Sequence, residues 1–281
     1  INKAYTAETY RDFDKARSLY SKALEANPGK MEIAQKIKGL NEIIAKSIQF
    51  NTLFENGKYE ELEKEYSRLL RRSENKSIPE YYLGRAKCYI KLDNLNRAGR
   101  DLEEAISLSG GYYIDALLVR STYYEYPEIN QPERAIADLE VVINTYPDRY
   151  DLLFRKAQLN KQLQNYSLAK NDFAIAKSLL DKEIALKEEN QLNSGKLFFY
   201  RGVCLANLNE IKKAAIDFNQ ATKLGIPPED NNEIYNIINE LYVKGVAYLE
   251  QNDYEQSIEL FIKVIDLDPT HKNAWLKKGE A

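Results

Sequence analysis

The stretch "GVAYLEQNDYEQSIELFIKVIDLDPTHKNAW", residues 245 to 275, decides the fold. Its small residue Ser257 is followed by Phe261 after four positions and by Val264 after seven. Offsets of zero, four and seven place side chains on one face of an α-helix. Asn252, five residues before Ser257, is of a type that tolerates the left-handed backbone of a tight turn. The stretch therefore predicts a helix, a turn and a second helix.

The same pattern recurs seven times along the chain, which indicates an array of repeated units. The anchors at offset zero are Ala16, Leu62, Ala98, Ala135, Ala169, Ala214 and Ser257. Four residues later come Tyr20, Tyr66, Leu102, Leu139, Phe173, Phe218 and Phe261, and seven later come Ala23, Leu69, Ala105, Val142, Ala176, Ala221 and Val264. The expected turn residues are Arg11, Gly57, Asp93, Asn130, Gln164, Asn209 and Asn252.

Two further sets of residues keep a fixed distance from the anchors. Twelve positions before five of the anchors stand small residues: Ala4, Ala86, Ala157, Gly202 and Gly245. We expect small residues where a neighbouring helix approaches closely. Twelve positions after three of the anchors stand Pro28, Pro147 and Pro269, which should end the second helices.

These residues resemble the tetratricopeptide repeat family, whose period is about 34 residues and whose pattern is an early Trp and Gly, then Ala, Phe and a closing Pro. The stretch "YRDFDKARSLYSKALEANP", residues 10 to 28, carries the same resemblance. The resemblance covers essentially the whole chain. It implies an all-α fold, a right-handed superhelical solenoid of about seven helix-turn-helix repeats plus a final single helix.

We expect residues 1–281 to form one array. The approximate repeats are 1–28, 29–77, 78–110, 111–147, 148–190, 191–229 and 230–269, with a partial repeat at 270–281. None of the breaks between them is a Gly/Ser-rich linker, which favours one domain over two.

Some anchors are farther apart than the family period, which predicts inserts in three repeats. Residues 31–44 should lengthen a helix by about three turns. Residues 179–196 should extend a second helix and end in a loop at 193–195, and residues 225–238 should form a proline-marked loop that runs into a longer first helix. In the fourth repeat, Pro127 and Pro132 stand where the inter-helix turn is expected.

The closing stretch "NAWLKKGEA", residues 273 to 281, opens a repeat whose second helix is missing. An array needs a terminal cap with a polar outer face. We therefore expect residues 272–281 to form a short helix packed on the seventh repeat, and the natural protein to continue past Ala281. The alternative is that this half-repeat is itself the cap at a natural end.

Charge and hydropathy argue against a polyanionic partner and against a membrane span. The chain has 40 basic and 43 acidic residues and a formal net charge of -3, so we expect no nucleic-acid partner. Residues 85–100 combine basic side chains with nearby Tyr81, Tyr82 and Tyr89, which leaves RNA binding as a minor alternative, but these tyrosines fall mostly on packing positions. No run of eighteen or more apolar residues occurs, so we expect no membrane insertion within these residues.

The residues that could carry chemistry form no constellation. His271 is the only histidine and follows Pro269 in a turn, where a solvated residue is more common than a general base. Cys88 and Cys204 both lie ten positions before an anchor, so we expect them to be buried, inert and unbridged. No nucleotide-binding, phosphate-loop or nucleophile-elbow motif occurs. We therefore expect no catalytic residues, no metal and no cofactor, and a protein that is not an enzyme.

In the family, first helices line a concave surface that binds an extended peptide or a partner's helix. The resemblance places this lining fifteen, eleven and eight residues before each anchor. The candidate peptide-binding residues are Asn51, Phe154, Gln158, Phe199, Val203, Tyr242, Val246 and Leu249. Further lining positions include Lys161 and Ala206. The alternative is that the long inserts pack into this groove and bury these side chains within the chain.

The resemblance also allows a test for the carboxylate clamp that holds acidic chaperone tails. Of its five donors only Asn51 is present, because Ser47 and Gly84 replace the first Lys and the next Asn. Asp115 and Val119 stand in place of the last Lys and Arg. We expect no binding of chaperone C-terminal tails.

The sequence thus predicts a non-catalytic protein-interaction scaffold that binds a peptide or a partner helix. The alternative is a regulatory or substrate-recruiting repeat segment of a larger enzyme or of a cell-envelope assembly.

Overall fold

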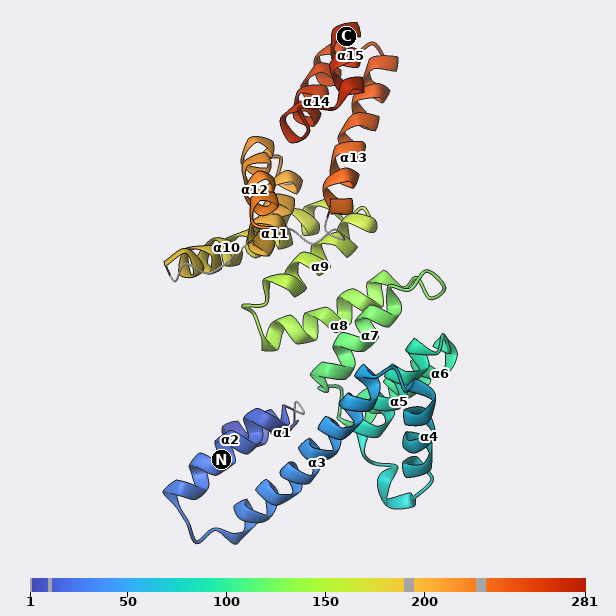
Figure 1. Cartoon of the computed structure of the whole chain (residues 1–281), viewed down its shortest axis with the longest axis vertical. Coiled ribbons are helices and arrows are strands. Elements are labelled where there is room, and N and C mark those ends of the chain that lie inside the picture. The colour runs from blue at the N-terminus through green and yellow to red at the C-terminus, as the bar shows by residue number, and fades with distance from the viewer. Residues whose placement is uncertain (1, 10–11, 190–194, 226–230) are drawn as a thin grey trace. The chain divides into compact units, whose positions relative to one another are not determined.

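The structure is a computed structural model, and it describes residues 2–9, 12–189, 195–225 and 231–281 (Figure 1). Over these residues the chain forms fifteen α-helices and one short 3₁₀-helix, η1 (Ser73–Asn75), and no strand. The expected all-α fold is therefore confirmed. The chain divides into two units, Ile1–Thr145 and Tyr146–Ala281.

Each unit is a series of helices in which neighbours along the chain pack together, except that α12 packs against α14 and not against α13. The helices of the first unit are α1 (Asn2–Thr9), α2 (Phe13–Ala26), α3 (Met31–Glu55), α4 (Tyr59–Leu70), α5 (Pro79–Lys91), α6 (Leu95–Leu108), α7 (Ile114–Tyr124) and α8 (Pro132–Thr145). Those of the second are α9 (Tyr150–Gln162), α10 (Tyr166–Glu189), α11 (Gly195–Asn207), α12 (Ile211–Lys223), α13 (Asn231–Glu250), α14 (Tyr254–Leu267) and α15 (Lys272–Glu280).

The turns inside the repeats have the left-handed backbone that the sequence pattern predicts. Gly57 has a φ of 73°, and the non-glycine turn residues have φ values between 42° and 67°: Asp93, Asn130, Gln164, Asn209 and Asn252. The seventh expected turn residue, Arg11, lies outside the described residues. Such a backbone is strained for most L-residues, so the side chains found here are largely those that tolerate it.

The ends of the helices also follow from local sequence. α2, α8 and α14 end two residues before Pro28, Pro147 and Pro269, as expected of a residue that cannot continue a helix. At the start of α14 the Asp253 carboxylate accepts a hydrogen bond from the Gln256 backbone N–H at 3.3 Å, which caps the helix. Helix boundaries at these points are therefore fixed without tertiary contacts.

The anchors form the core of the repeats. All seven anchor residues and the seven residues four positions later are buried. The small residues twelve positions earlier are buried as well, and a Cβ added at Gly202 would lie 2.6 Å from Phe218 Cε1. Phe218 belongs to the second helix of the same repeat, so Gly202 is small because that ring occupies the space. The expected close helix approach is confirmed at this position.

Two of the inserts lengthen helices as predicted. α3 is 25 residues long and α10 is 24 residues long. Ile33 and Leu40, from the amino-terminal half of α3, join the buried cluster of α1 and α2 around Tyr20. The first insert therefore packs against the first repeat.

The other loop predictions are only partly covered by the described residues. Gly195 was expected in a loop but is the first residue of α11; residues 193 and 194 lie outside the described part. α13 is 20 residues long, as the third insert predicts, whereas most of its proline-marked loop, 226–230, is not described. Pro127 lies in the connection between α7 and α8, as expected, whereas Pro132 is the first residue of α8.

Candidate interaction surface

The predicted groove residues fall into two groups that differ in exposure. Phe154, Phe199 and Val203 are buried, with at most 5% of their surface exposed. Gln158, Tyr242, Val246 and Leu249 are partly buried, and Asn51 is exposed. A buried side chain offers almost no surface to a peptide, so the exposure expected of the first group is not found.

The burial of Phe154 and Phe199 has a clear packing cause. The Phe154 ring lies 5.8 Å from Phe173, the core aromatic of its own repeat, and 4.9 Å from Tyr200 of the next first helix. Phe199 lies 6.1 Å from Phe218 in the same way. Phe154 therefore lies between two repeats, where Tyr200 covers it, whereas the ring contact of Phe199 with Phe218 lies within one repeat.

α13 covers part of the predicted groove of the fifth repeat. Gln158 Nε2 of α9 donates a hydrogen bond to Glu233 Oε1 at 3.3 Å, and Lys161 Nζ donates to Glu240 Oε2 at 2.7 Å. Both acceptors lie on α13, whose amino-terminal half comes from the third insert, and Figure 1 shows this end of α13 beside α9 and α11. Of these two acceptors only Glu233 belongs to the third insert, residues 225–238, so the insert contacts one predicted groove position, Gln158.

Glu240 is the central charge of this contact. Its other oxygen, Oε1, accepts a hydrogen bond from Lys244 Nζ at 2.8 Å. Burial by itself would raise the pKa of Glu240, but the hydrogen bonds from Lys161 and Lys244 more than compensate and lower the pKa below its ordinary value. The carboxylate is therefore held in its charged form between two lysines.

Tyr242, Val246 and Leu249 lie farther along α13 and pack at the edge of another cluster. Its buried members are Ile238, Phe261, Val264 and Ala274, from α13, α14 and α15. The Tyr242 ring lies 5.8 Å from Phe261 and 5.1 Å from His271. The smaller part of these side chains that stays uncovered is mainly apolar surface.

The lone histidine has a structural role. His271 Nδ1 accepts a hydrogen bond from the Ala274 backbone N–H at 3.1 Å and so caps α15. The expected short closing helix is confirmed, and Ala274 is its buried contact with the repeat before it.

The cysteines are buried and unbridged, as expected. Burial raises the pKa of Cys88 and of Cys204 to about 12, so both thiols are protonated at neutral pH. Neither is placed to act as a nucleophile.

Sequence reasoning missed a set of buried ion pairs that recurs in the central repeats. In three repeats an arginine of the first helix forms a bidentate ion pair with an aspartate of the following helix, with hydrogen bonds of 2.7 to 2.9 Å. The pairs are Arg85 with Asp101, Arg120 with Asp138 and Arg201 with Asp217. In the fifth repeat, Lys156 and Asp172 take these places at 3.5 Å. The signal that could have revealed the set is an aspartate three residues after each of these four anchors.

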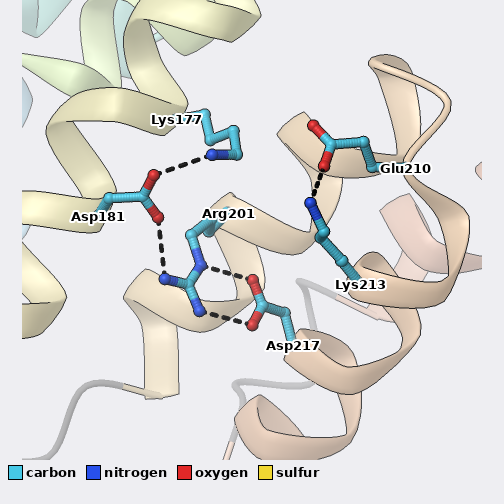
Figure 2. Close-up of polar contacts among 6 residues, drawn as sticks. All are labelled: Lys177, Asp181, Arg201, Glu210, Lys213 and Asp217. Atoms are coloured by element: carbon cyan, nitrogen blue, oxygen red, sulfur yellow. Dashed lines mark hydrogen bonds and ion pairs between the residues drawn. The ribbon is translucent and has the colours of Figure 1, made fainter.

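Figure 2 shows the most extended of these networks. Arg201 Nη1 also donates to Asp181 Oδ1 of α10 at 2.9 Å, and Lys177 donates to the other oxygen of Asp181 at 2.9 Å. The hydrogen bond with Asp217 is the main reason that the pKa of Arg201 is raised above its ordinary value. Every charge is matched, and the network joins α10, α11 and α12, which indicates a structural role.

Basic residues near Tyr89 are also engaged within the chain. Arg85 and Arg97 lie with their guanidinium carbons 5.8 and 5.7 Å from the centre of the Tyr89 ring, and Tyr89 is buried. This tyrosine has no free face on which a base could stack.

Two searches of the described residues bear on other classes of function. No group of three or more His, Cys, Asp or Glu side chains there could hold a metal ion. Within the same part of the chain, no helix is both long and apolar enough to span a membrane.

A family model described as the tetratricopeptide repeat matches residues 79–112 and 241–271. The human mitochondrial import receptor subunit TOM70 is 25% identical over 213 residues, which cover 74% of this chain and 32% of that protein. The chain thus spans about a third of the length of this relative.

Solved structures with low sequence identity also resemble the chain. YrrB, described as a tetratricopeptide repeat protein with an unusual peptide-binding site, is 22% identical, with a TM-score of 0.47 over 76% of this chain and 97% of that one. PilF of Pseudomonas aeruginosa is 13% identical, with a TM-score of 0.49 over 83% and 95%. The chain is thus an all-helical protein of paired helices over its described residues, and two of its segments match the tetratricopeptide repeat model.

Proposed function

We propose that the chain is a non-catalytic scaffold that binds a helix or an extended peptide of a protein partner on the inner side of its first helices. Tetratricopeptide repeat proteins generally mediate interactions between proteins. The observation that carries the proposal is that Gln158 and Lys161, two positions of the expected groove, already bind a helix of the chain itself. A surface with the side chains to hold one helix can recognise another of similar chemistry.

Tyr242, Val246 and Leu249 add apolar surface to the proposed groove. They are partly exposed, and large aromatic side chains that become buried in an interface contribute most of its affinity. Loss of such a residue commonly weakens binding by about 2 kcal/mol or more, which is roughly a thirtyfold change in Kd.

The test uses the full chain and a Tyr242→Ala/Leu249→Ala variant as baits in extracts of the native cell. Proteins captured by the unmodified chain are identified, purified and titrated against both baits. We expect the variant to bind the partner at least about thirtyfold more weakly while it keeps its helical circular dichroism. Tyr254→Ala is the matched control, because Tyr254 is an exposed tyrosine at the start of α14, outside the first helices. Equal affinity of all three baits, or no specific partner of the unmodified chain, would refute the proposal.

A further inference from the structure

One face of α13 is complementary to the surface formed by α9, α10 and α11. Glu233, Ile237, Glu240 and Leu241 follow one another at offsets of zero, four, seven and eight, so they share a face of the helix. The two glutamates accept the hydrogen bonds from Gln158 and Lys161 described above. The acidic groups of this face therefore meet polar and basic groups on α9.

The apolar residues of the same face border a hollow of about 280 Å³. Ile237 and Leu241 line it on the α13 side, and Ala169, Phe173 and Ala206 line it on the other. Ile237 is buried. The hollow is large enough for an additional or larger apolar side chain, so α13 does not fill the surface completely.

The surface opposite α13 is basic and polar around this apolar floor. Lys161, Lys170 and Asn207 line the hollow from α9, α10 and α11, and Glu240 is the only acidic residue among its described lining. A ligand for this surface must supply carboxylates, as α13 does with Glu240.

The contact is also of a kind that can exchange. The side chains of Lys161 and Glu240 are 32% and 40% exposed, and an ion pair that water reaches contributes little to stability, about 1 kcal/mol or less. Ile234, Ile238 and Leu241 of α13 pack in the cluster around Phe261 of α14, so Leu241 belongs to this cluster as well as to the glutamate face. Release of α13 from the surface of α9 to α11 therefore breaks the contacts of Glu233 and Glu240, whereas Ile234 and Ile238 can keep theirs with α14.

We propose that the glutamate face of α13 is an internal ligand, and that the surface it covers on α9, α10 and α11 binds an acidic amphipathic helix of a partner protein in its place. The recognised pattern has two acidic residues seven apart with branched aliphatic residues between and beside them. This inference rests on the proposed function and adds to it the location of the site, the chemistry of the partner and a competition within the chain.

The competition has a defined consequence for affinity. A segment of the same chain acts at a high effective concentration, in the millimolar range for short connections, so a free helix of equal affinity binds the intact protein only weakly. Weakening the internal contact raises the apparent affinity for a free helix by the same factor.

The probe is a fluorescent peptide of residues 231–244, NNEIYNIINELYVK, and its binding to the full chain is followed by fluorescence polarisation. The opened variant is Glu233→Ala/Glu240→Ala, which removes the two internal acceptors but leaves the apolar residues of α13 in place. We expect this variant to bind the peptide several-fold more tightly than the unmodified chain, because both internal contacts of the glutamate face are lost.

A charge exchange then tests the assigned contact. Adding Lys161→Glu to the opened variant should weaken peptide binding about tenfold or more, and a Glu240→Lys peptide should restore it. Lys213→Glu is the matched control, since it makes the same charge change on α12, where the exposed Lys213 pairs with Glu210 (Figure 2). Circular dichroism of each variant verifies that it is folded.

The outcomes separate this inference from the proposed function. No saturable binding to the opened variant, or equal loss with Lys161→Glu and Lys213→Glu, overturns the inference. A captured partner that depends on Tyr242 and Leu249 but not on Lys161 also overturns it and leaves the proposed function intact. If no partner is captured, the proposed function is refuted, but the peptide measurements still test directly whether the surface of α9 to α11 binds an acidic helix.

Discussion

Replacing Gly202 by alanine tests the repeat packing at its tightest point in the second unit. In α11 the new Cβ would lie 2.6 Å from Phe218 Cε1 and 2.7 Å from Cδ1. Carbon atoms in favourable contact are about 3.5–4.0 Å apart, so the overlap is about 1 Å. Phe218 is itself buried and packs against Phe199, so its ring has little room to move away.

Two opposing terms set the magnitude. Overpacking of a filled core typically costs about 1–3 kcal/mol. Alanine inside a helix is favoured over glycine by about 0.5–1 kcal/mol. We therefore expect Gly202→Ala to lower the free energy of unfolding by about 1–2 kcal/mol.

Gly39→Ala supplies the matched control in the other direction. Gly39 lies inside α3, is exposed, and a Cβ built there has no atom within 4 Å. Only the helix-propensity term acts, so this variant should gain about 0.5–1 kcal/mol. The same chemical change is thus expected to have opposite signs at two helical sites.

The assay is urea unfolding followed by circular dichroism, with hydrogen exchange of α11 and α12 as a local readout, because repeat proteins need not unfold in one step. A Gly202→Ala/Phe218→Leu variant, with each single variant beside it, gives a double-mutant cycle. The loss of unfolding free energy in the double variant should be about 1 kcal/mol smaller than the sum of the two single losses, since leucine relieves the overlap with the new Cβ. Strictly additive costs, or a Gly202→Ala protein as stable as the unmodified one, would refute the reasoning.

Three further predictions concern the core, the ion pairs and the thiols. Ala98→Leu, Ala169→Leu and Ala214→Leu should each cost about 1–3 kcal/mol in urea unfolding, because these anchors are buried against neighbouring helices; unchanged stability of all three would show that the repeat register is wrong. Asp217→Ala leaves the Arg201 guanidinium without its main partner and should lower the free energy of unfolding by about 2–3 kcal/mol, less than for a fully buried pair because Arg201 is 21% exposed. Lys213→Ala, which breaks an exposed pair, should leave the unfolding midpoint unchanged. Equal effects of the two variants would contradict the structure. Since the pKa of Cys88 and of Cys204 is raised in the folded protein to about 12, their contribution to stability is complete below the ordinary thiol pKa of about 9 and decreases as pH rises from there to 12. At pH 8 we accordingly expect a thiol reagent to label neither cysteine before unfolding, and fast labelling of the native chain would disprove their burial.

Features of the fold that depend on short stretches of chain could be predicted well. The turn residues were identified because a left-handed backbone restricts the side chain at that position, as at Asn209 and Asn252. The anchors were identified because one helix face must be apolar to be buried.

The candidate site could be predicted less well, because exposure depends on what packs over a helix. Phe154 and Tyr242 stand in corresponding positions, fifteen residues before their anchors, yet Phe154 is covered by Tyr200 and Tyr242 is partly open. The contact of Lys161 with Glu240 joins residues 79 positions apart, a separation that no local pattern encodes. The Arg201 pair with Asp217 was missed for a similar reason, since each residue alone has the sequence signature of a solvated helix face.

The sequence by itself determined the helical repeat, its turns, the positions where helices end and the small residues at close helix contacts, because each of these depends on backbone preferences and on helical periodicity. Only the tertiary structure decided that α13 reaches back to α9, that Phe199 and Val203 belong to the core and that Tyr242 and Leu249 keep open surface. The reason is that burial and charge pairing are properties of two surfaces together, and the second surface comes from a distant part of the chain.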